Sequence, residues 1–215
     1  MIVNSLRSIF KLKYYQLALI ILQVVLLLQF NLTGPLTSKI NVFNTYQGLN
    51  LDFIFFNLNW IFYYLVAELL MLPKLEELML SPNPMLQVRY PSRKRIFQEV
   101  VMTLVLAAIC YNVIYFIVMV ISTKFQNLNL ELLLFANETL GLISFTLLLL
   151  LLGLIFNRTF SWQVGIILGI FSLGFKTNFL FMVTTPSLGA IYFELLTSVV
   201  LMVIIYFVNK KVEVV

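Results

Sequence analysis

Two groups of charged residues in this 215-residue chain have the types and the spacing to do chemistry. The first is the stretch RYPSRKRIF, residues 89–97, which places four of the chain's 14 Lys and Arg residues within seven positions. Such a cluster can bind lipid phosphates or acidic side chains of another protein. The second group is Lys176 and Glu194, which interrupt long apolar runs and can form an ion pair that a charged ligand group competes for.

Other kinds of chemistry are excluded by residues that the sequence lacks. It contains no histidine and a single cysteine, Cys110, so no Ser-His or Cys-His nucleophile pair, HExxH zinc site, cysteine metal cluster or internal disulfide can form. It also has no GxxxxGK[ST] phosphate-binding loop. We therefore predict no catalytic residues, no metal site and no cofactor in this chain. A mechanism that uses carboxylates alone, with Glu68, stays open.

The composition places these residues in a membrane protein. Apolar residues make up 61% of the chain and charged residues 11%, against about 45–50% and about 25% in soluble domains. A window of about 20 residues, the length that crosses a bilayer, predicts six helical spans in one all-α transmembrane domain, 1–215. No small-residue cleavage site follows the first apolar run, so we expect no removable signal peptide. The predicted spans are 14–31, 53–72, 99–122, 139–156, 163–183 and 188–208.

The basic residues predict the orientation of these spans. If the amino terminus is inside, eleven of the 14 Lys and Arg residues fall in inner segments, and only Lys39, Lys124 and Lys176 do not. Inner loops of membrane proteins are enriched in Lys and Arg, so both termini should be cytoplasmic. The low charge and the Asn, Ile, Lys and Phe usage suggest a bacterial plasma membrane.

The longest inner segment, residues 73–98, contains the basic stretch. KLEELML can extend the second span as a helix, SPNP should end that helix, and the Pro91-Ser92 pair predicts a new helix that begins near Arg93 and continues into the third span. Ordinary anchoring to lipid headgroups is one interpretation of the charges. A broken helical hairpin favours a protein partner instead, and the predicted partner-binding residues are Arg89, Tyr90, Arg93, Lys94, Arg95 and Phe97.

Three further elements are predicted from local patterns. Residues 2–13 have the spacing of a short helix that lies in the membrane surface, and LNLELLLFAN, residues 128–137, could form a similar helix before the fourth span. The fifth span mixes Gly, Lys, Thr, Asn and Pro into its apolar run and could be broken.

The intramembrane polar residues should lie at one depth. Lys176 and Glu194 are each about 10 Å below the outer surface at 1.5 Å per residue, so we expect them to pair. Thr177 and Asn178 extend this polar patch, and Glu68 is a further buried charge. The alternative is that Lys176 extends to the outer interface and the two charges never meet.

The arrangement resembles the membrane subunit of type-2 ABC exporters, the small six-span permeases that include bacteriocin- and lantibiotic-associated transporters. The matching segments are residues 2–13, the MLQVRYPSRKRIF loop and FKTNFLFMVTTPS, which correspond to the family's interfacial helix, its coupling helix and its polar region between spans five and six. The resemblance implies a separate cytoplasmic ATPase that binds ATP and Mg²⁺ and docks on the loop. It also implies a homodimer or a second membrane subunit, and no nucleic acid partner.

Two other functions remain open. The chain could be a stand-alone bacteriocin-immunity or structural membrane protein, and copurification with an ATPase would count against this. It could also be the substrate-binding subunit of a vitamin importer, which has a similar length and six spans. That family docks through small residues on its first helix, where LALIILQVVLLLQF offers only Ala18.

Overall fold

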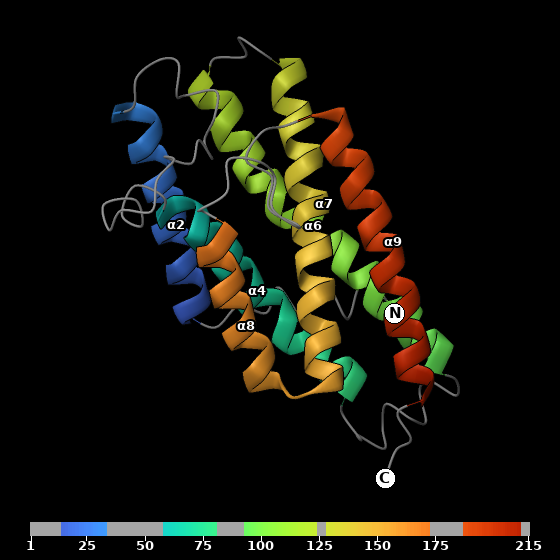
Figure 1. Cartoon of the computed structure of the whole chain (residues 1–215). Helices are drawn as coiled ribbons and strands as arrows, with labels where there is room; N and C mark the ends of the chain where they lie inside the picture. Colours follow the sequence, from blue (N-terminus) through green and yellow to red (C-terminus); the bar gives the residue numbers. More distant parts are fainter. Residues whose placement is uncertain (1–13, 34–57, 81–92, 124–127, 173–186, 212–215) are drawn as a thin grey trace.

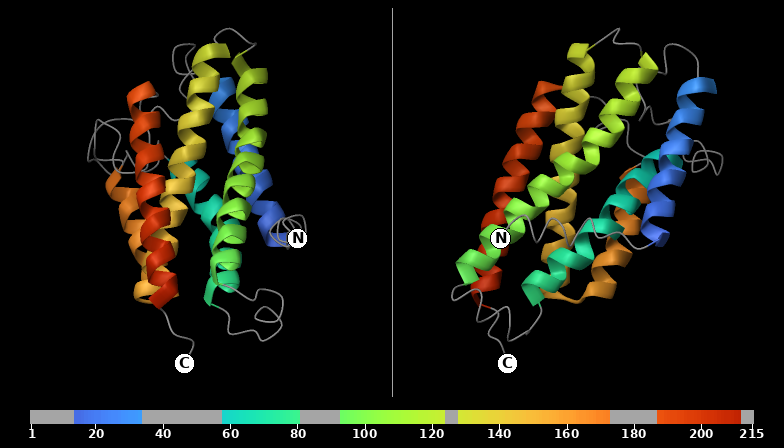
Figure 2. Two further views of the ribbon diagram at one scale, coloured as in Figure 1. Left: turned by 90° about the vertical axis from the view of Figure 1, so that its right-hand side faces the viewer. Right: turned by 180° about the vertical axis from the view of Figure 1, so that it is seen from behind.

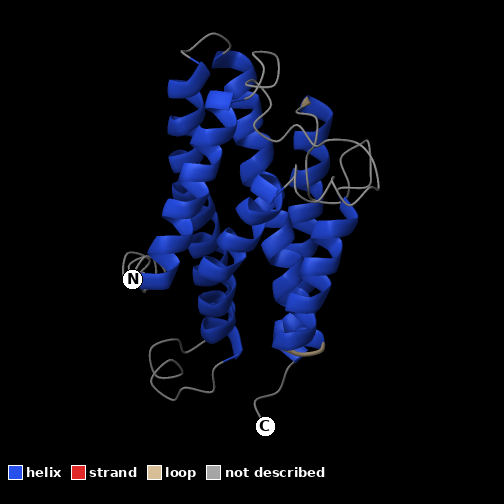
Figure 3. Ribbon diagram, turned by 90° about the vertical axis from the view of Figure 1, so that its left-hand side faces the viewer, coloured by secondary structure: helices blue, strands red, loops and turns tan. Residues whose placement is uncertain are grey.

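The computed structural model describes residues 14–33, 58–80, 93–123, 128–172 and 187–211. Within these ranges the chain forms six α-helices and no strand (Figure 3). The prediction of an all-α fold is therefore confirmed. The helices are α2 (Tyr14–Thr33), α4 (Leu58–Leu80), α6 (Arg93–Thr123), α7 (Leu128–Ile155), α8 (Arg158–Ser172) and α9 (Leu188–Lys211).

Local sequence signals explain the starts of two helices. The side-chain carbonyl of Asn157 accepts a hydrogen bond of 2.7 Å from the backbone N–H of Phe160, which caps the start of α8. The hydroxyl of Ser187 accepts one of 3.1 Å from the N–H of Ala190 and caps α9 in the same way. Both helices therefore begin with an ordinary N-cap.

The two helices that border the basic stretch have the predicted extents. α4 continues through Pro73 to Leu80 and so includes KLEELML as a helical extension. α6 begins at Arg93 and runs for 31 residues without a break. At 1.5 Å per residue α6 is about 46 Å long, which exceeds the roughly 30 Å core of a bilayer. Part of α6 must therefore extend beyond any membrane that it crosses.

Consecutive helices run in opposite directions along the bundle (Figures 1 and 2). α7 lies at the centre and packs against α4, α6, α8 and α9, while α2 packs against α4 and α6. α2, α6 and α8 begin at one end of the bundle, and α4, α7 and α9 finish there. We call this end, the lower one in Figure 1, the basic end.

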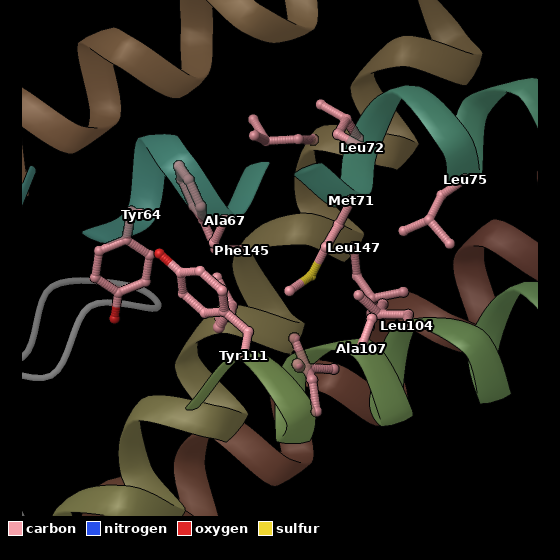
Figure 4. Close-up of a cluster of buried hydrophobic side chains, with 14 of the residues drawn as sticks. Tyr64, Ala67, Met71, Leu72, Leu75, Leu104, Ala107, Tyr111, Phe145 and Leu147 are labelled. Atoms are coloured by element: carbon pink, nitrogen blue, oxygen red, sulfur yellow. The ribbon is translucent and has the colours of Figure 1, made fainter. Parts of the chain in front are cut away.

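The core is formed where α4, α6 and α7 meet (Figure 4). Met71, Leu72 and Leu75 of α4 lie there with Leu104 of α6 and Leu147 of α7, and all five are almost fully buried. Ala67, Ala107 and Ala108 are also completely buried. Such small residues allow the backbones of two helices to approach closely, as is typical of packing between membrane helices.

Three of the described helices are long and apolar enough to cross a membrane, over Lys94–Val118 of α6, Glu131–Ile155 of α7 and Leu188–Asn209 of α9. Of the most apolar window of α7, 72% is buried inside the bundle, whereas only 22% of that of α9 is buried. α7 is therefore surrounded by protein, and α9 leaves much of its apolar surface uncovered. These lengths and compositions suit a membrane protein.

Two sequence predictions need correction, and others fall outside the described residues. The prediction of a separate helix over 128–137 was wrong, because these residues and the predicted fourth span form one continuous helix, α7. The fifth span was predicted to begin at residue 163, but α8 begins at Arg158. The end of that predicted span, the interfacial helix at residues 2–13 and the middle of the 73–98 segment lie outside the described residues.

Candidate functional site

A ladder of hydrogen bonds joins α4, α6 and α7 in the half of the bundle away from the basic end. The Tyr63 hydroxyl donates to the Asn112 side-chain carbonyl. The Asn112 amide donates to the Thr139 hydroxyl over 2.8 Å, and that hydroxyl donates to the carbonyl of Phe135 over 2.7 Å. Asn112 is buried, and its side-chain oxygen and nitrogen both have partners on neighbouring helices. The ladder therefore fixes how the three helices meet.

Tyr63 of this ladder lies together with three further tyrosines. The rings of Tyr63 and Tyr64 lie edge to face at 5.0 Å, and those of Tyr63 and Tyr115 do the same at 5.0 Å. The Tyr111 hydroxyl donates to the backbone carbonyl of Tyr63 over 2.9 Å, and the Tyr115 hydroxyl donates to that of Tyr111 over 3.1 Å. Figure 4 shows Tyr64 and Tyr111 beside the apolar core. This part of the interior is therefore lined by aromatic rings that also carry hydroxyl groups.

Three buried carboxyl groups line the same interior. Glu138 of α7 is 4% exposed, and its Oε2 atom accepts a hydrogen bond of 3.1 Å from the Tyr64 hydroxyl. Glu68 of α4 is 1% exposed, and its Oε1 atom accepts one of 2.7 Å from the Thr146 hydroxyl. Glu194 of α9 is 2% exposed and lies within electrostatic range of Glu138. Each has one oxygen without a hydrogen-bond partner, namely Oε1 of Glu138, Oε2 of Glu68 and Oε2 of Glu194.

Serine hydroxyls hold α7 and α9 together next to Glu194. The hydroxyls of Ser144 and Ser198 lie 2.6 Å apart, and both donate to the backbone carbonyl of Glu194, over 3.2 Å and 2.8 Å. These bonds satisfy the backbone of Glu194 and not its carboxyl group. The helix contact is therefore polar and specific, while the carboxyl group itself stays poor in donors.

A fourth buried carboxyl group, Glu76, lies at the basic end. The Nε atom of Arg158 lies 3.0 Å from Oε2 of Glu76, although the contact lacks the geometry of a hydrogen bond. Burial raises the pKa of the Glu76 carboxyl, and the nearby Arg158 guanidinium offsets only part of this rise. Gly153 of α7 leaves the space that this carboxyl group occupies, since a Cβ atom there would lie 2.8 Å from Oε1 of Glu76.

The predicted partner-binding residues are placed as follows. Arg89 and Tyr90 lie outside the described residues, and Arg93 is the first residue of α6. Lys94 and Arg95 are exposed on the first turn of that helix. Phe97 is half-buried, and its ring packs against that of Tyr206 on α9 at 5.6 Å. Lys94 and Arg95 are therefore available to a partner, whereas Phe97 already has a contact within the bundle.

The predicted intramembrane residues are only partly described. Lys176 and Asn178 lie outside the described residues, so the proposed Lys176–Glu194 pair stays a prediction. Glu68 and Glu194 are both buried, as expected for interior charges. Their surroundings differ, because Glu68 accepts a hydrogen bond from the Thr146 hydroxyl whereas Glu194 lies within electrostatic range of Glu138.

Sequence reasoning missed Glu138 because it placed this residue in a loop just before the fourth span. One signal could have revealed it. No Pro or Gly separates Leu128 from Thr139, so the helix was free to continue toward its amino terminus. Glu131 in the first turn also favours a helix start there.

Within the described helices no group of three or more His, Cys, Asp or Glu side chains is placed to hold a metal ion. Comparisons of the chain with protein-family models, with curated proteins and with solved structures found no match.

Proposed function

We propose that this chain is the membrane subunit of a transporter that is powered by a separate cytoplasmic ABC-type ATPase. The observation that supports the proposal best is the distribution of positive charge over the described helices. All seven Lys and Arg residues in these helices lie toward the basic end, four of them in the first turn of α6 or in α4. They are Lys74, Arg93, Lys94, Arg95, Arg158, Lys210 and Lys211.

This distribution fits a bacterial plasma membrane in which the basic end faces the cytoplasm. The alternating directions of the six helices place the start of α2 and the end of α9 at that end, so both termini would be cytoplasmic. In this proposal α2, α4 and α8 are spans in addition to α6, α7 and α9. The α8 span would continue into residues 173–183.

The docking element is the connection between α4 and α6. α4 extends to Leu80 and α6 begins at Arg93, so both helices lead the chain to the basic end and bracket residues 81–92. The exposed Lys94 and Arg95 stand beside this connection and can bind an acidic surface. A rigid pair of helices at this place suits the transfer of movement from an ATPase to the bundle.

The polar interior supports a transport role over a structural one. Glu68, Glu138, Glu194 and Asn112 are all buried within helices of a bundle whose surface is apolar. Ionisable residues in such an interior are costly, and they typically belong to substrate or ion pathways. A protein that only filled space in the membrane would be more stable with apolar residues at these positions.

The test is copurification of the tagged chain in mild detergent, followed by measurement of ATP hydrolysis and mass spectrometry of the complex. We expect an ATPase to accompany the wild-type chain, and Lys94→Ala with Arg95→Ala to release it without loss of membrane insertion. Arg93→Ala with Phe97→Ala should also release it, but Phe97 packs on Tyr206, so the first pair is the cleaner probe.

The matched control is Lys74→Ala with Glu77→Ala, which removes an exposed ion pair of 3.1 Å from the same end of the bundle. This variant should keep the ATPase, because exposed pairs contribute little to stability. If the wild-type chain purifies with no ATP hydrolysis, the proposal is wrong and a stand-alone immunity or structural role is favoured. If the Lys94 and Arg95 variant retains the ATPase, the segment is only a lipid anchor.

A further inference from the structure

Glu138 and Glu194 form a pair of buried carboxyl groups with very few hydrogen-bond donors. Glu138 is 4% exposed and Glu194 is 2% exposed, and the two groups lie within electrostatic range of each other. Among the described residues, the Tyr64 hydroxyl donates a hydrogen bond of 3.1 Å to Oε2 of Glu138. Oε1 of Glu138 and Oε2 of Glu194 are buried without any hydrogen-bond partner.

Among the described residues, the titratable and charged groups that face the pair offer no positive charge. α4 contributes Tyr63 and Tyr64, which lie within electrostatic range of both carboxyl groups. α6 contributes Tyr115, in edge contact with Tyr63, and Tyr111, which is bonded to Tyr115. Glu131 lies two turns from Glu138 on α7 itself, and Glu68 lies one turn beyond Tyr64 on α4.

The cations of the described helices are far from this pair. They all lie toward the basic end, where Arg158 contacts Glu76 and Lys74 contacts Glu77. Lys210 is 16 residues from Glu194 on the same helix, which is about 24 Å. Lys176, outside the described residues, supplies one positive charge at most. Two ionised carboxylates would therefore repel each other, and Oε1 of Glu138 and Oε2 of Glu194 would lie in an apolar interior without a hydrogen-bond donor.

We propose that Glu138 and Glu194 form a proton-binding site that holds at least one proton at neutral pH. A proton supplies what the pair lacks, since it cancels one of the two charges and turns one carboxyl oxygen into a hydrogen-bond donor. A metal ion fits less well, because Ca²⁺ takes six to eight oxygen ligands and the described residues place no group of three or more His, Cys, Asp or Glu side chains to hold a metal. The site goes beyond the proposed transport function and does not depend on the ATPase.

The site also has neighbours that could accept its proton. Glu68 lies one helical turn from Tyr64, the donor to Glu138, and Glu76 lies two further turns along α4. The carboxyl groups thus follow the contact between α4 and α7 from Glu138 to the Glu76–Arg158 pair at the basic end. A chain of this kind is typical of proton pathways in membrane proteins.

The experiment is infrared difference spectroscopy of the purified full-length chain in lipid vesicles, in H₂O and D₂O, over a pH titration. A protonated carboxyl group has a carbonyl band separate from that of a carboxylate, and the band shifts in D₂O. We expect this band at neutral pH in the wild type, with its loss or marked reduction in Glu138→Gln combined with Glu194→Gln. Glu77→Gln is the control, because Glu77 is exposed at the basic end and should leave the band unchanged.

A second variant keeps the test valid if the double substitution does not fold. Tyr64→Phe removes the donor to Glu138 and should shift the frequency of the band while the carboxyl groups remain. A band that is unchanged in both the Gln variant and Tyr64→Phe would overturn the proposal. The last measurement compares the carboxyl band during titration with NaCl and during titration with N-methylglucamine chloride. If sodium ions abolish the band, the site binds a metal cation and the proposal is wrong.

Discussion

The Nε atom of Arg158 lies 3.0 Å from Oε2 of Glu76, so the first residue of α8 is tied by charge to the part of α4 that follows Pro73. Glu76 is 3% exposed, whereas more than half of the Arg158 side chain is exposed. The pair therefore joins a buried acid to a base that remains hydrated. The contribution of this pair to the stability of the bundle therefore depends on whether the Glu76 carboxyl group is protonated.

We expect Glu76 to make the stability of the bundle depend on pH. The pKa of its carboxyl group is raised in the folded state by burial, so the folded chain binds the proton more tightly than the unfolded chain. The stabilisation that this tighter proton binding gives is fully present below the unfolded pKa of about 4.3. It is lost as pH rises through the pKa of Glu76 in the folded chain. Thermal unfolding at a series of pH values should show this loss in the wild type relative to Glu76→Gln. A difference between the two proteins that does not vary with pH would contradict the assignment.

Gly153 should be sensitive to even a small side chain. A Cβ atom there would lie 2.8 Å from Oε1 of Glu76 and must displace that carboxyl group. Because the carboxyl group is the end of a flexible side chain, we expect Gly153→Ala to cost about 1 kcal/mol, the low end for overpacking. Chemical denaturation should show that this cost disappears in a Glu76→Ala background. Gly189→Ala is the control, since its Cβ would meet only Ser187 Oγ at 3.9 Å.

The hydrogen bond from Tyr63 to Asn112 should contribute only modestly to stability. Interhelical hydrogen bonds in a membrane protein average about 0.6 kcal/mol, with a maximum near about 1.7 kcal/mol, in double-mutant cycles. A cycle of Tyr63→Phe and Asn112→Ala should therefore give a coupling free energy in this range. A value close to zero would mean that the two side chains do not interact in the membrane. The same cycle with Tyr111→Phe replacing Tyr63→Phe tests whether the effect is specific to the bonded pair.

Cysteine labelling tests the orientation of the bundle. The native Cys110 is exposed and should first be replaced by Ala. In that background, cysteines at Ser38 and Lys124 should react with an impermeant reagent added outside, and one at Asn83 should not. Labelling of Asn83 from outside would place the basic end on the wrong side of the membrane and refute the topology.

A charge exchange tests the predicted Lys176–Glu194 pair. Lys176→Glu and Glu194→Lys should each impair folding or transport, since an isolated charge at this depth costs on the order of 3 kcal/mol. The double exchange should restore much of the loss. If the double variant is no better than the worse single variant, the pair does not exist.

The sequence predicted the helices well and their mutual contacts poorly. The start of α6 at Arg93 followed from the Pro91-Ser92 pair, and the extension of α4 followed from the helix-forming KLEELML segment. Both depend only on residues close together in the chain. The partner of Glu138 could not be predicted, because Tyr64 lies 74 residues earlier and only the packing of α4 on α7 brings it near.

The central position of α7 has a consequence for the order in which the chain is made. α7 leaves the ribosome before α9, and its Ser144 finds its partner Ser198 only 54 residues later. Until then Ser144 and Glu138 have no α9 surface to meet, although the α4 contacts of Glu138 are already available. Newly made α7 should therefore pack against α4 and α6 first, and against α9 only after that helix has been synthesised. A nascent chain halted before Leu188 would leave the α9-facing side of α7, including Ser144, uncovered.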